Sequence, residues 1–360
     1  MSHKSYSLIL IGAALCFALA SILFWHIVTK PAFYGYDSHG DLTRLGSFYI
    51  QPPLTHNIAY QKHHKELRDY LTEGSADQFS VLTIGDSHSD GVGGAYYQDY
   101  LADKYGISVI NSAGTHKYNS WAQLNMLIDL GYLGQLGIKT VVFEIGERGV
   151  STLTAPPSLP AVARKEYEKD RIAYKEASSR DMVPPYALLT TTMGSANVRF
   201  IKNRLYASNH EYSVSKDVYK EYLTIPAFTN TGQENVLYYY HDDLDYLTAK
   251  PDAVAINNTL NAISDKLATR GVKFIFFVVP DKSDVYFPYV ARERNIPENN
   301  FIAELMPLPK TYEFIDSKKI LRDAVAAGEQ DLFWADDTHW SWKAQQHVGD
   351  AIATVLQNAD

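Results

Sequence analysis

Two motifs at distant points of the chain carry residue types that suit nucleophilic catalysis. Residues 85–89 (GDSHS) directly follow an apolar run, and residues 335–340 (ADDTHW) stand near the C-terminus. A serine hydroxyl needs a base to take its proton, and an imidazole base needs a carboxylate to fix its tautomer and stabilise its charged form. We therefore predict Ser87 as a nucleophile and His339 as its base, with Asp336 or Asp337 as the acid.

The segments around these motifs predict an α/β fold. Short apolar runs typical of buried parallel strands cover residues 80–85, 107–111, 140–145, 273–279 and 312–315. Helical patterns cover residues 121–128, 253–267, 317–326 and 343–356. This alternation predicts a doubly wound, five-stranded parallel sheet. Ser87 would then follow the first strand and His339 would precede the last helix, at the carboxyl edge where such folds place their sites.

The remaining segments divide the chain. Residues 31–56 contain three prolines and are predicted to be a connector, and residues 57–360 are predicted to be the catalytic domain. This domain is expected to open with a polar helix near residues 60–73, on which His63 and His64 face solvent. Residues 150–248 interrupt the alternation with several prolines. We interpret them either as an inserted cap over the sheet or as a surface elaboration without function.

The N-terminus predicts a membrane anchor. Residues 7–28 contain no acidic or basic residue and reach the length of about 20 residues that a helix needs to cross a bilayer. The small residues at 18–20 resemble a signal-peptidase site, but the apolar run continues beyond them, which favours an uncleaved anchor over residues 1–30. The only cysteine, Cys16, lies in this run, so the rest of the chain has no disulfide or thiolate metal site.

Composition and missing motifs exclude several other functions. A net charge of -8 and a pI near 5.8 provide no basic field for nucleic acid, and argue mildly against a polyuronate substrate. The chain contains no GxxxxGK[ST], GxGxxG or HExxH motif, so we expect neither a nucleotide or nicotinamide cofactor nor a metal. Its 26 tyrosines and five tryptophans suit sugar faces, although they are equally ordinary core residues.

The two motifs resemble those of the SGNH (GDSL-type) hydrolase superfamily, whose first block is Gly-Asp-Ser and whose last block is an Asp two or three places before His. More narrowly, the chain resembles the polysaccharide O-acetyltransferases related to alginate acetylation (AlgX/AlgJ-like). The narrower resemblance rests on residues 337–340 (DTHW), on residues 279–282 (VPDK) with Tyr286, and on residues 144–148 (EIGER). It runs from about Ser80 to the C-terminus, without the insertion.

The resemblance has two departures. In the alginate proteins the Asp-His-Trp motif precedes the serine motif, whereas here the serine comes first, as in ordinary SGNH enzymes. The fold can be the same in both after circular permutation. The oxyanion-hole Asn of the superfamily is replaced by Gly146-Glu147-Arg148. The resemblance then implies that the backbone N–H groups of Ser87 and Gly114 hold the oxyanion, with Arg148 as a substitute donor.

The resemblance also bears on the other site residues. Thr338 and Trp340 match the acetyltransferase pattern, which favours Asp337 over Asp336 as the acid. His88, His116 and Trp340 are candidates for contacting the substrate, with structural roles as the alternative. Asp281 and Lys282 are expected to form an exposed ion pair in a turn, without a catalytic role.

The resemblance implies an O-acetyltransferase that acts on an extracytoplasmic polysaccharide through an acetyl-serine. Two alternatives stay open: a carbohydrate acetyl esterase with the same triad, and a non-catalytic polysaccharide-binding subunit of an export complex. The acetyl donor would come from an acetyl ester or from a partner, a multipass membrane O-acyltransferase, and no cofactor is expected. The catalytic domain would lie in the periplasm, held by a single-pass anchor in the inner membrane.

Overall fold

The computed structural model describes residues 3–29, 40–46, 58–74, 76–91, 94–113, 119–154, 164–180, 195–229, 234–293 and 297–358. Its centre is a six-stranded sheet in the order β1-β3-β2-β4-β7-β8, and every neighbouring pair is parallel. The strands are β1 Lys65–Glu66, β2 Val81–Ile84, β3 Val109–Asn111, β4 Thr140–Gly146, β7 Lys273–Val279 and β8 Glu313–Ile315. The predicted α/β class is confirmed, but the predicted number of five strands is wrong.

The additional strand, β1, lies inside the segment predicted as a polar helix. Lys65 and Glu66 pair with Ile110 and Asn111 of β3, and the helix that follows, α4, covers only Leu67–Glu73. The Asn111 amide also donates a hydrogen bond to the Glu66 carboxylate, at 3.1 Å. A two-residue strand has no alternation of its own, so only its partner strand defines it.

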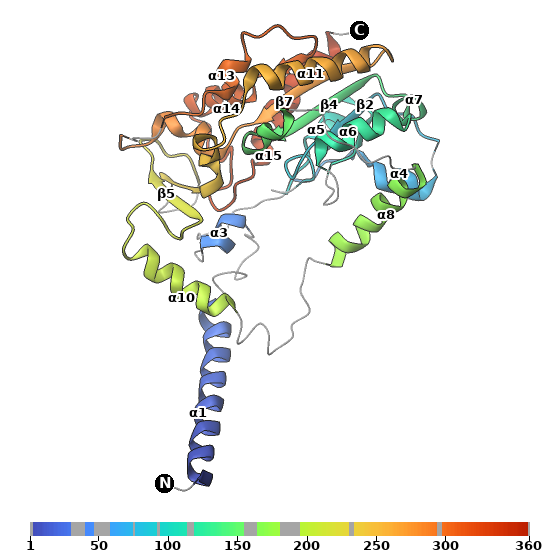
Figure 1. Cartoon of the computed structure of the whole chain (residues 1–360). Coiled ribbons are helices and arrows are strands. Elements are labelled where there is room, and N and C mark those ends of the chain that lie inside the picture. Colours follow the sequence, from blue (N-terminus) through green and yellow to red (C-terminus); the bar gives the residue numbers. More distant parts are fainter. Residues whose placement is uncertain are drawn as a thin grey trace.

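Alternate residues of the strands face two hydrophobic cores, one on each side of the sheet. Leu82, Val141 and Phe143 belong to one core, and Val142 and Ile275 to the other. Helices α4, α6 Ser120–Asp129, α7 Tyr132–Leu136, α11 Ala253–Ala268 and α13 Phe301–Leu305 supply the first core. Helices α5 Tyr97–Tyr105, α12 Lys282–Val285, α14 Ser317–Ala326 and α15 Trp342–Gln357 supply the second (Figure 1). Strands buried on both faces explain the continuous apolar runs in the sequence.

Between β4 and α11, the described residues form six elements. They are the 3-10 helix η2 Glu147–Leu153, α8 Arg164–Arg180, α10 Ser195–Ala207, the strands β5 Val218–Tyr222 and β6 Val236–Tyr240, and the 3-10 helix η3 His241–Leu247. β5 and β6 form an antiparallel hairpin, and Val218 and Leu237 are buried in the second core. The hairpin is thus part of the folded domain. That the whole segment 150–248 forms a cap stays a prediction.

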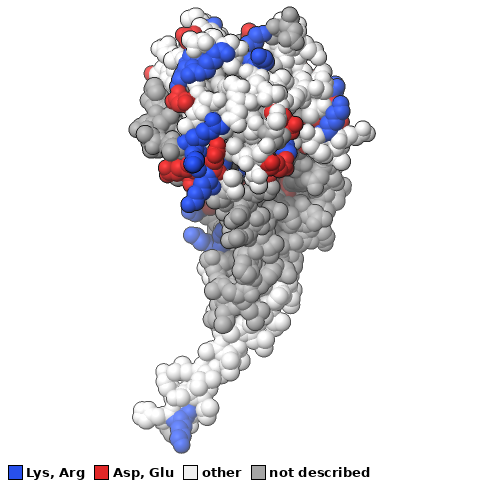
Figure 2. All heavy atoms as spheres, turned by 90° about the vertical axis from the view of Figure 1, so that its right-hand side faces the viewer, with Lys and Arg blue, Asp and Glu red and all other residues white. Residues whose placement is uncertain are grey.

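The N-terminal helix projects from the rest of the protein (Figure 1). It consists of α1 His3–Phe24 and a π-helical turn, η1 Trp25–Thr29. Residues His3–Val28 are long and apolar enough to cross a membrane, and no other helix of the described residues is. Figure 2 shows that α1 carries charged side chains only at its free end. The helix is compatible with a single-pass anchor or with a signal sequence.

Candidate functional site

The serine motif lies where β2 ends, at the carboxyl edge of the sheet. The turn requires glycine at Gly85, because a Cβ there would overlap the Glu144 carboxylate and the Ser89 side chain. The Ser120 hydroxyl donates to the Gly85 carbonyl at 2.6 Å, and the Asp86 N–H donates to Glu144 Oε2 at 3.1 Å. These contacts fix the turn that presents Ser87, whose side chain stays partly exposed.

The histidine motif brings His339 to the same edge. Phe333 and Trp340 form an isolated antiparallel bridge, so the loop that ends at His339 returns on itself before α15 begins. His339 Nε2 lies 2.8 Å from Ser87 Oγ, and His339 Nδ1 lies 2.5 Å from Asp337 Oδ1. The structure therefore brings Ser87, His339 and Asp337 together as a hydrogen-bonded triad. The carboxylate placed against the imidazole is that of Asp337.

Charge and burial shift the pKa values of Asp337 and His339 in opposite directions. Burial alone would raise the pKa of Asp337, but the hydrogen bond and charge of His339 outweigh it and hold that pKa below its usual range. Burial alone would lower the pKa of His339, but the hydrogen bond to Asp337 and the charges of Asp337 and Asp41 raise it. The environment thus favours the imidazolium that forms when a serine proton is taken up.

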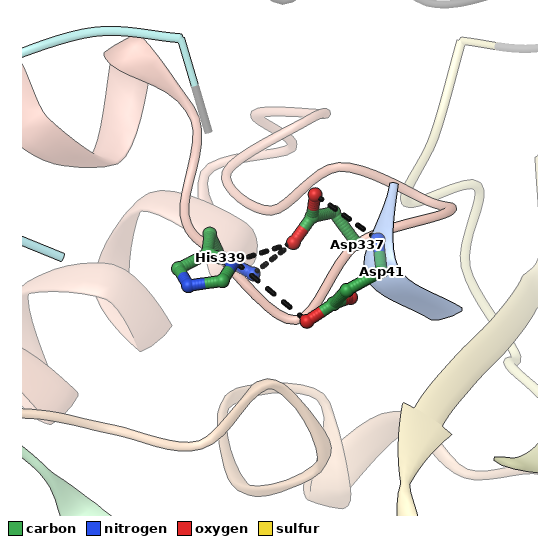
Figure 3. Close-up of side chains that lie close together, drawn as sticks. All are labelled: Asp41, Asp337 and His339. Atoms are coloured by element: carbon green, nitrogen blue, oxygen red, sulfur yellow. Dashed lines mark hydrogen bonds and ion pairs between the residues drawn. The ribbon is translucent and has the colours of Figure 1, made fainter. Parts of the chain in front are cut away.

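A second carboxylate, Asp41, supports the same imidazole. Its Oδ2 lies 3.8 Å from His339 Nδ1, and its two oxygens accept hydrogen bonds from the Thr338 N–H at 2.8 Å and the Thr338 hydroxyl at 2.5 Å. Its own N–H donates to Asp337 Oδ2 at 3.4 Å. Figure 3 shows both carboxylates directed at the same edge of the His339 ring. Burial and the nearby charge of Asp337 raise the pKa of Asp41 to about 6.

Asp41 was not found from the sequence. It is the first residue of the short helix α3, Asp41–Gly46, inside the segment predicted as connector. Potential ligand atoms of Asp41, Asp337 and His339 lie within 4.8 Å of one another. A metal ion there would have to replace the hydrogen bond between His339 and Asp337, so these residues fit the orientation of His339 toward Ser87 better than a metal site.

Asp86 ties the serine loop to the end of β4. Its Oδ1 accepts the His88 N–H at 3.0 Å, and its Oδ2 accepts the Gly146 N–H at 2.7 Å. Gly146 stands where the superfamily pattern leads one to expect an oxyanion donor, but its N–H is already engaged by Asp86. Among the described residues, the Ser87 N–H has no hydrogen-bond partner, so it is available to an oxyanion.

Of the other two predicted oxyanion donors, the structure describes Arg148 but not Gly114. Gly114, and with it the candidate substrate contact His116, lies outside the described residues. The Arg148 guanidinium is partly exposed and lies 3.2 Å from Asp243 and 3.8 Å from Asp281. Its charge lowers the pKa of His339, so it lies near enough to act on charge in the site.

His88 and Trp340, both candidates for contacting substrate, are buried. The His88 ring lies 4.9 Å from the His339 ring and 5.6 Å from the Trp340 ring, measured between centroids. Burial lowers the pKa of His88 to about 3, so its imidazole is neutral near pH 7. Trp340 has no exposed surface and packs against Phe277 and Tyr97. Its position supports the back of the site.

Asp281 and Lys282 are buried, so the expectation of an exposed ion pair is wrong. Lys282 Nζ donates hydrogen bonds to the carbonyls of Trp334, Ala335 and Asp337, at 2.6, 3.0 and 3.1 Å. Burial lowers its pKa to about 8. One buried ammonium thus binds three carbonyls of the loop that carries Asp337 and His339, which the sequence could not show.

His64 also differs from expectation. His63 faces solvent as predicted, but His64 is enclosed, with Nδ1 2.6 Å from Asp99 and Nε2 2.8 Å from Glu66. Burial would lower its pKa, but the hydrogen bonds to the two carboxylates raise it to about 9. His64 therefore connects Glu66 of β1 to Asp99 of α5, and its side chain is not part of a solvated face.

Residues 230–360 match the family model described as SGNH hydrolase-like domain, acetyltransferase AlgX. The resemblance predicted from the sequence is confirmed over this segment. The AlgX-type segment contains Asp337, His339 and Lys282, whereas Ser87 and Asp41 precede it. No curated protein matches the chain. The match supports an acetyltransferase- or hydrolase-like function.

Proposed function

We propose that the protein is an O-acetyltransferase that modifies an extracytoplasmic polysaccharide through an acetyl-serine intermediate. The observation that carries this proposal is the pair of contacts on one imidazole, 2.8 Å to Ser87 Oγ and 2.5 Å to Asp337 Oδ1. This arrangement suits a serine nucleophile with its general base and orienting acid.

In the first half-reaction, His339 Nε2 takes the proton of Ser87 while Oγ attacks the carbonyl carbon of an acetyl ester. The tetrahedral intermediate collapses, the donor's C–O bond breaks, and His339 returns the proton to the departing alkoxide. In the second half-reaction, His339 takes the proton of a sugar hydroxyl, which attacks acetyl-Ser87. The proton then returns to Ser87 Oγ as the acetyl group leaves on the sugar.

The negative oxygen of each intermediate needs donors. The Ser87 N–H is the first, and we assign the Gly114 N–H as the second. The Arg148 guanidinium takes the place of the missing Asn as a charged donor. Loss of one donor costs roughly 10²–10³ in rate in other serine enzymes, so the Arg148 contribution is measurable.

The charge of the protein bears on the polysaccharide acceptor, and its location bears on the acetyl donor. The net charge of -8 provides no basic field for a strongly anionic polymer, which suits a neutral or weakly charged polysaccharide. With α1 as a single-pass anchor in the inner membrane, the catalytic domain lies in the periplasm, where a multipass O-acyltransferase would supply acetyl groups. Anchoring both proteins in one membrane raises their effective concentration.

A carbohydrate acetyl esterase is the second candidate. The observation that favours it is the partial exposure of Ser87, because water that reaches an acetyl-serine can take the place of the sugar hydroxyl.

One experiment separates these functions. The full chain in detergent is given a chromogenic acetyl ester with and without oligosaccharide acceptors, and the enzyme and sugar are weighed by mass spectrometry after quenching. Ser87→Ala is compared with Ser80→Ala, an exposed serine at the opposite end of β2. Acetylated sugar that only Ser87→Ala loses supports transfer, and acetate release that no acceptor diverts supports an esterase. If neither acyl-enzyme nor product forms, the protein is not an enzyme of this kind and a binding subunit is favoured.

A further inference from the structure

Helix α10 lies against the end of the N-terminal helix. Its Asn197 side chain donates to the Ser21 carbonyl at 3.0 Å, and its Phe200 ring meets the Phe24 ring edge-on, with centroids 5.9 Å apart. Val28 packs on the same cluster. Figure 1 shows α10 running from this contact toward β5. The buried face of α10 thus rests on the last turns of the apolar helix.

A different face of α10 is apolar and exposed. Val198, Ile201 and Leu205 are 66%, 49% and 64% exposed. Among the described large apolar residues outside the N-terminal helix (α1 and η1), only Val254, at 55%, exceeds the lowest of these values. At 3.6 residues per turn their positions fall within an arc of about 60°. Three aliphatic side chains in one stripe on an otherwise folded protein indicate a surface that is covered in the native setting.

Basic residues flank this stripe. At 100° per residue, Lys202 lies about 40° beyond Val198 on one side of the stripe, and Arg204 lies about 60° beyond Ile201 on the other side. The Arg204 guanidinium is 5.2 Å from the Phe200 ring. An apolar stripe bordered by lysine and arginine is the pattern of helices that lie in the headgroup region of a bilayer.

The position at which α10 contacts the N-terminal helix agrees with a location in the headgroup region. A helix crosses the hydrocarbon core with about 20 residues, and counted from Ser7 that length ends near His26. The contacts of α10 with Ser21, Phe24 and Val28 therefore fall around the outer boundary of the hydrocarbon core. Membrane helices tilt by about 20° on average, which allows α10 to lie along the surface.

We propose that α10 lies in the headgroup region of the membrane that α1 spans and inserts Val198, Ile201 and Leu205 toward the acyl chains. This inference rests on the membrane anchoring included in the proposed function. Asn203 of α10 donates to the Leu45 carbonyl of α3 at 3.0 Å, and α3 carries Asp41. The membrane surface thereby fixes the orientation of the domain through the same short helix that contacts His339.

Spin labels on the full chain in lipid nanodiscs with phosphatidylglycerol test the proposal. Cys16 is the only cysteine and is exposed on α1, so the wild type reports the anchor itself. On a Cys16→Ser background, single cysteines replace Val198, Ile201 or Leu205, and Met306→Cys and Leu247→Cys are matched exposed controls remote from α1. The measurement is the relaxation of each label by oxygen, which concentrates in lipid, relative to a water-soluble nickel chelate.

We expect a higher oxygen-to-nickel ratio at all three α10 positions than at 306 and 247. If the α10 ratios equal those of the controls while the Cys16 label reports lipid, the anchor is right and the α10 proposal is wrong, leaving a protein partner as the occupant. If the Cys16 label also reports water, the anchoring itself is wrong and the α10 proposal is overturned with it.

Discussion

The Asp41 carboxylate lies 3.8 Å from Nδ1 of His339, although these residues stand near opposite ends of the chain. Its oxygens and its backbone N–H bind Thr338 and Asp337, the two residues that precede the histidine. The short helix α3, which follows the N-terminal apolar helix, therefore holds the histidine loop from the outside. A charge at this distance from a ring nitrogen also acts on the basicity of the imidazole.

Replacing Asp41 by Asn should move the pH dependence of the reaction. His339 acts as a base only when neutral, and the Asp41 charge contributes to its raised pKa. Without that charge the pKa falls, so the ascending limb of kcat/KM against pH should shift to lower pH. The measurement is ester turnover by the full chain between pH 4 and 9. Asp265→Asn, an exposed carboxylate on α11, should leave the limb in place. An unshifted limb in Asp41→Asn would show that Asp41 acts on structure alone.

The two neighbouring aspartates of the histidine motif should behave differently. Asp337→Asn removes the negative charge that fixes the His339 tautomer and stabilises its imidazolium, and should lower kcat by roughly 10³–10⁴, as the same change in a triad does elsewhere. Asp336→Asn should keep kcat within roughly tenfold of the wild type, although this residue is fully buried and its replacement should lower stability. Steady-state kinetics on both folded variants decides, and the reverse order of activities would make Asp336 the acid.

The contact between Ser87 and His339 could be predicted because strong patterns surround both residues. β2 is a continuous apolar run and α15 a clear amphipathic helix, so Ser87 and His339 had to lie at the same edge of a parallel sheet. The loop that contains Asp337 is short, which limited the acid to two positions. Spacing alone left both open, since backbone geometry decides which carboxylate meets the ring.

The residues that were missed lack any such pattern. Asp41 follows an irregular segment, and nothing in the sequence indicates that it contacts Thr338. Lys282 stands beside Asp281, which suggests an ion pair, but burial redirects its ammonium to three backbone carbonyls. β1 has two residues, too few to show the alternation of apolar and polar side chains that identifies a strand in a sequence. In each case long-range packing, and not local propensity, determines the result.

Removing the Lys282 ammonium should destabilise the protein. Lys282→Met keeps the length of the side chain but leaves the carbonyls of Trp334, Ala335 and Asp337 without their buried donor. We expect the free energy of unfolding to fall by about 3 kcal/mol, because unsatisfied buried polar groups are costly. Denaturant unfolding of the full chain in detergent measures it. Lys319→Met, at an exposed lysine on α14, should leave the free energy of unfolding nearly unchanged. Equal effects of the two substitutions would contradict the assigned role.

His64 should make stability depend on pH. Its folded-state pKa is about 9, above the ordinary 6.5, because Asp99 and Glu66 hold the imidazolium. The stabilisation is therefore complete below about pH 6.5 and is lost as pH rises through 9, amounting to roughly 3 kcal/mol. The quantity to measure is the difference in unfolding free energy between wild type and His64→Gln, at pH 6 and at pH 9.5. It should be large at pH 6 and small at pH 9.5, whereas His63→Gln, whose side chain is 65% exposed, should show little difference at either pH. A difference for His64→Gln that does not change with pH would mean that His64 stabilises β1 and α5 as a neutral ring, through packing and uncharged hydrogen bonds.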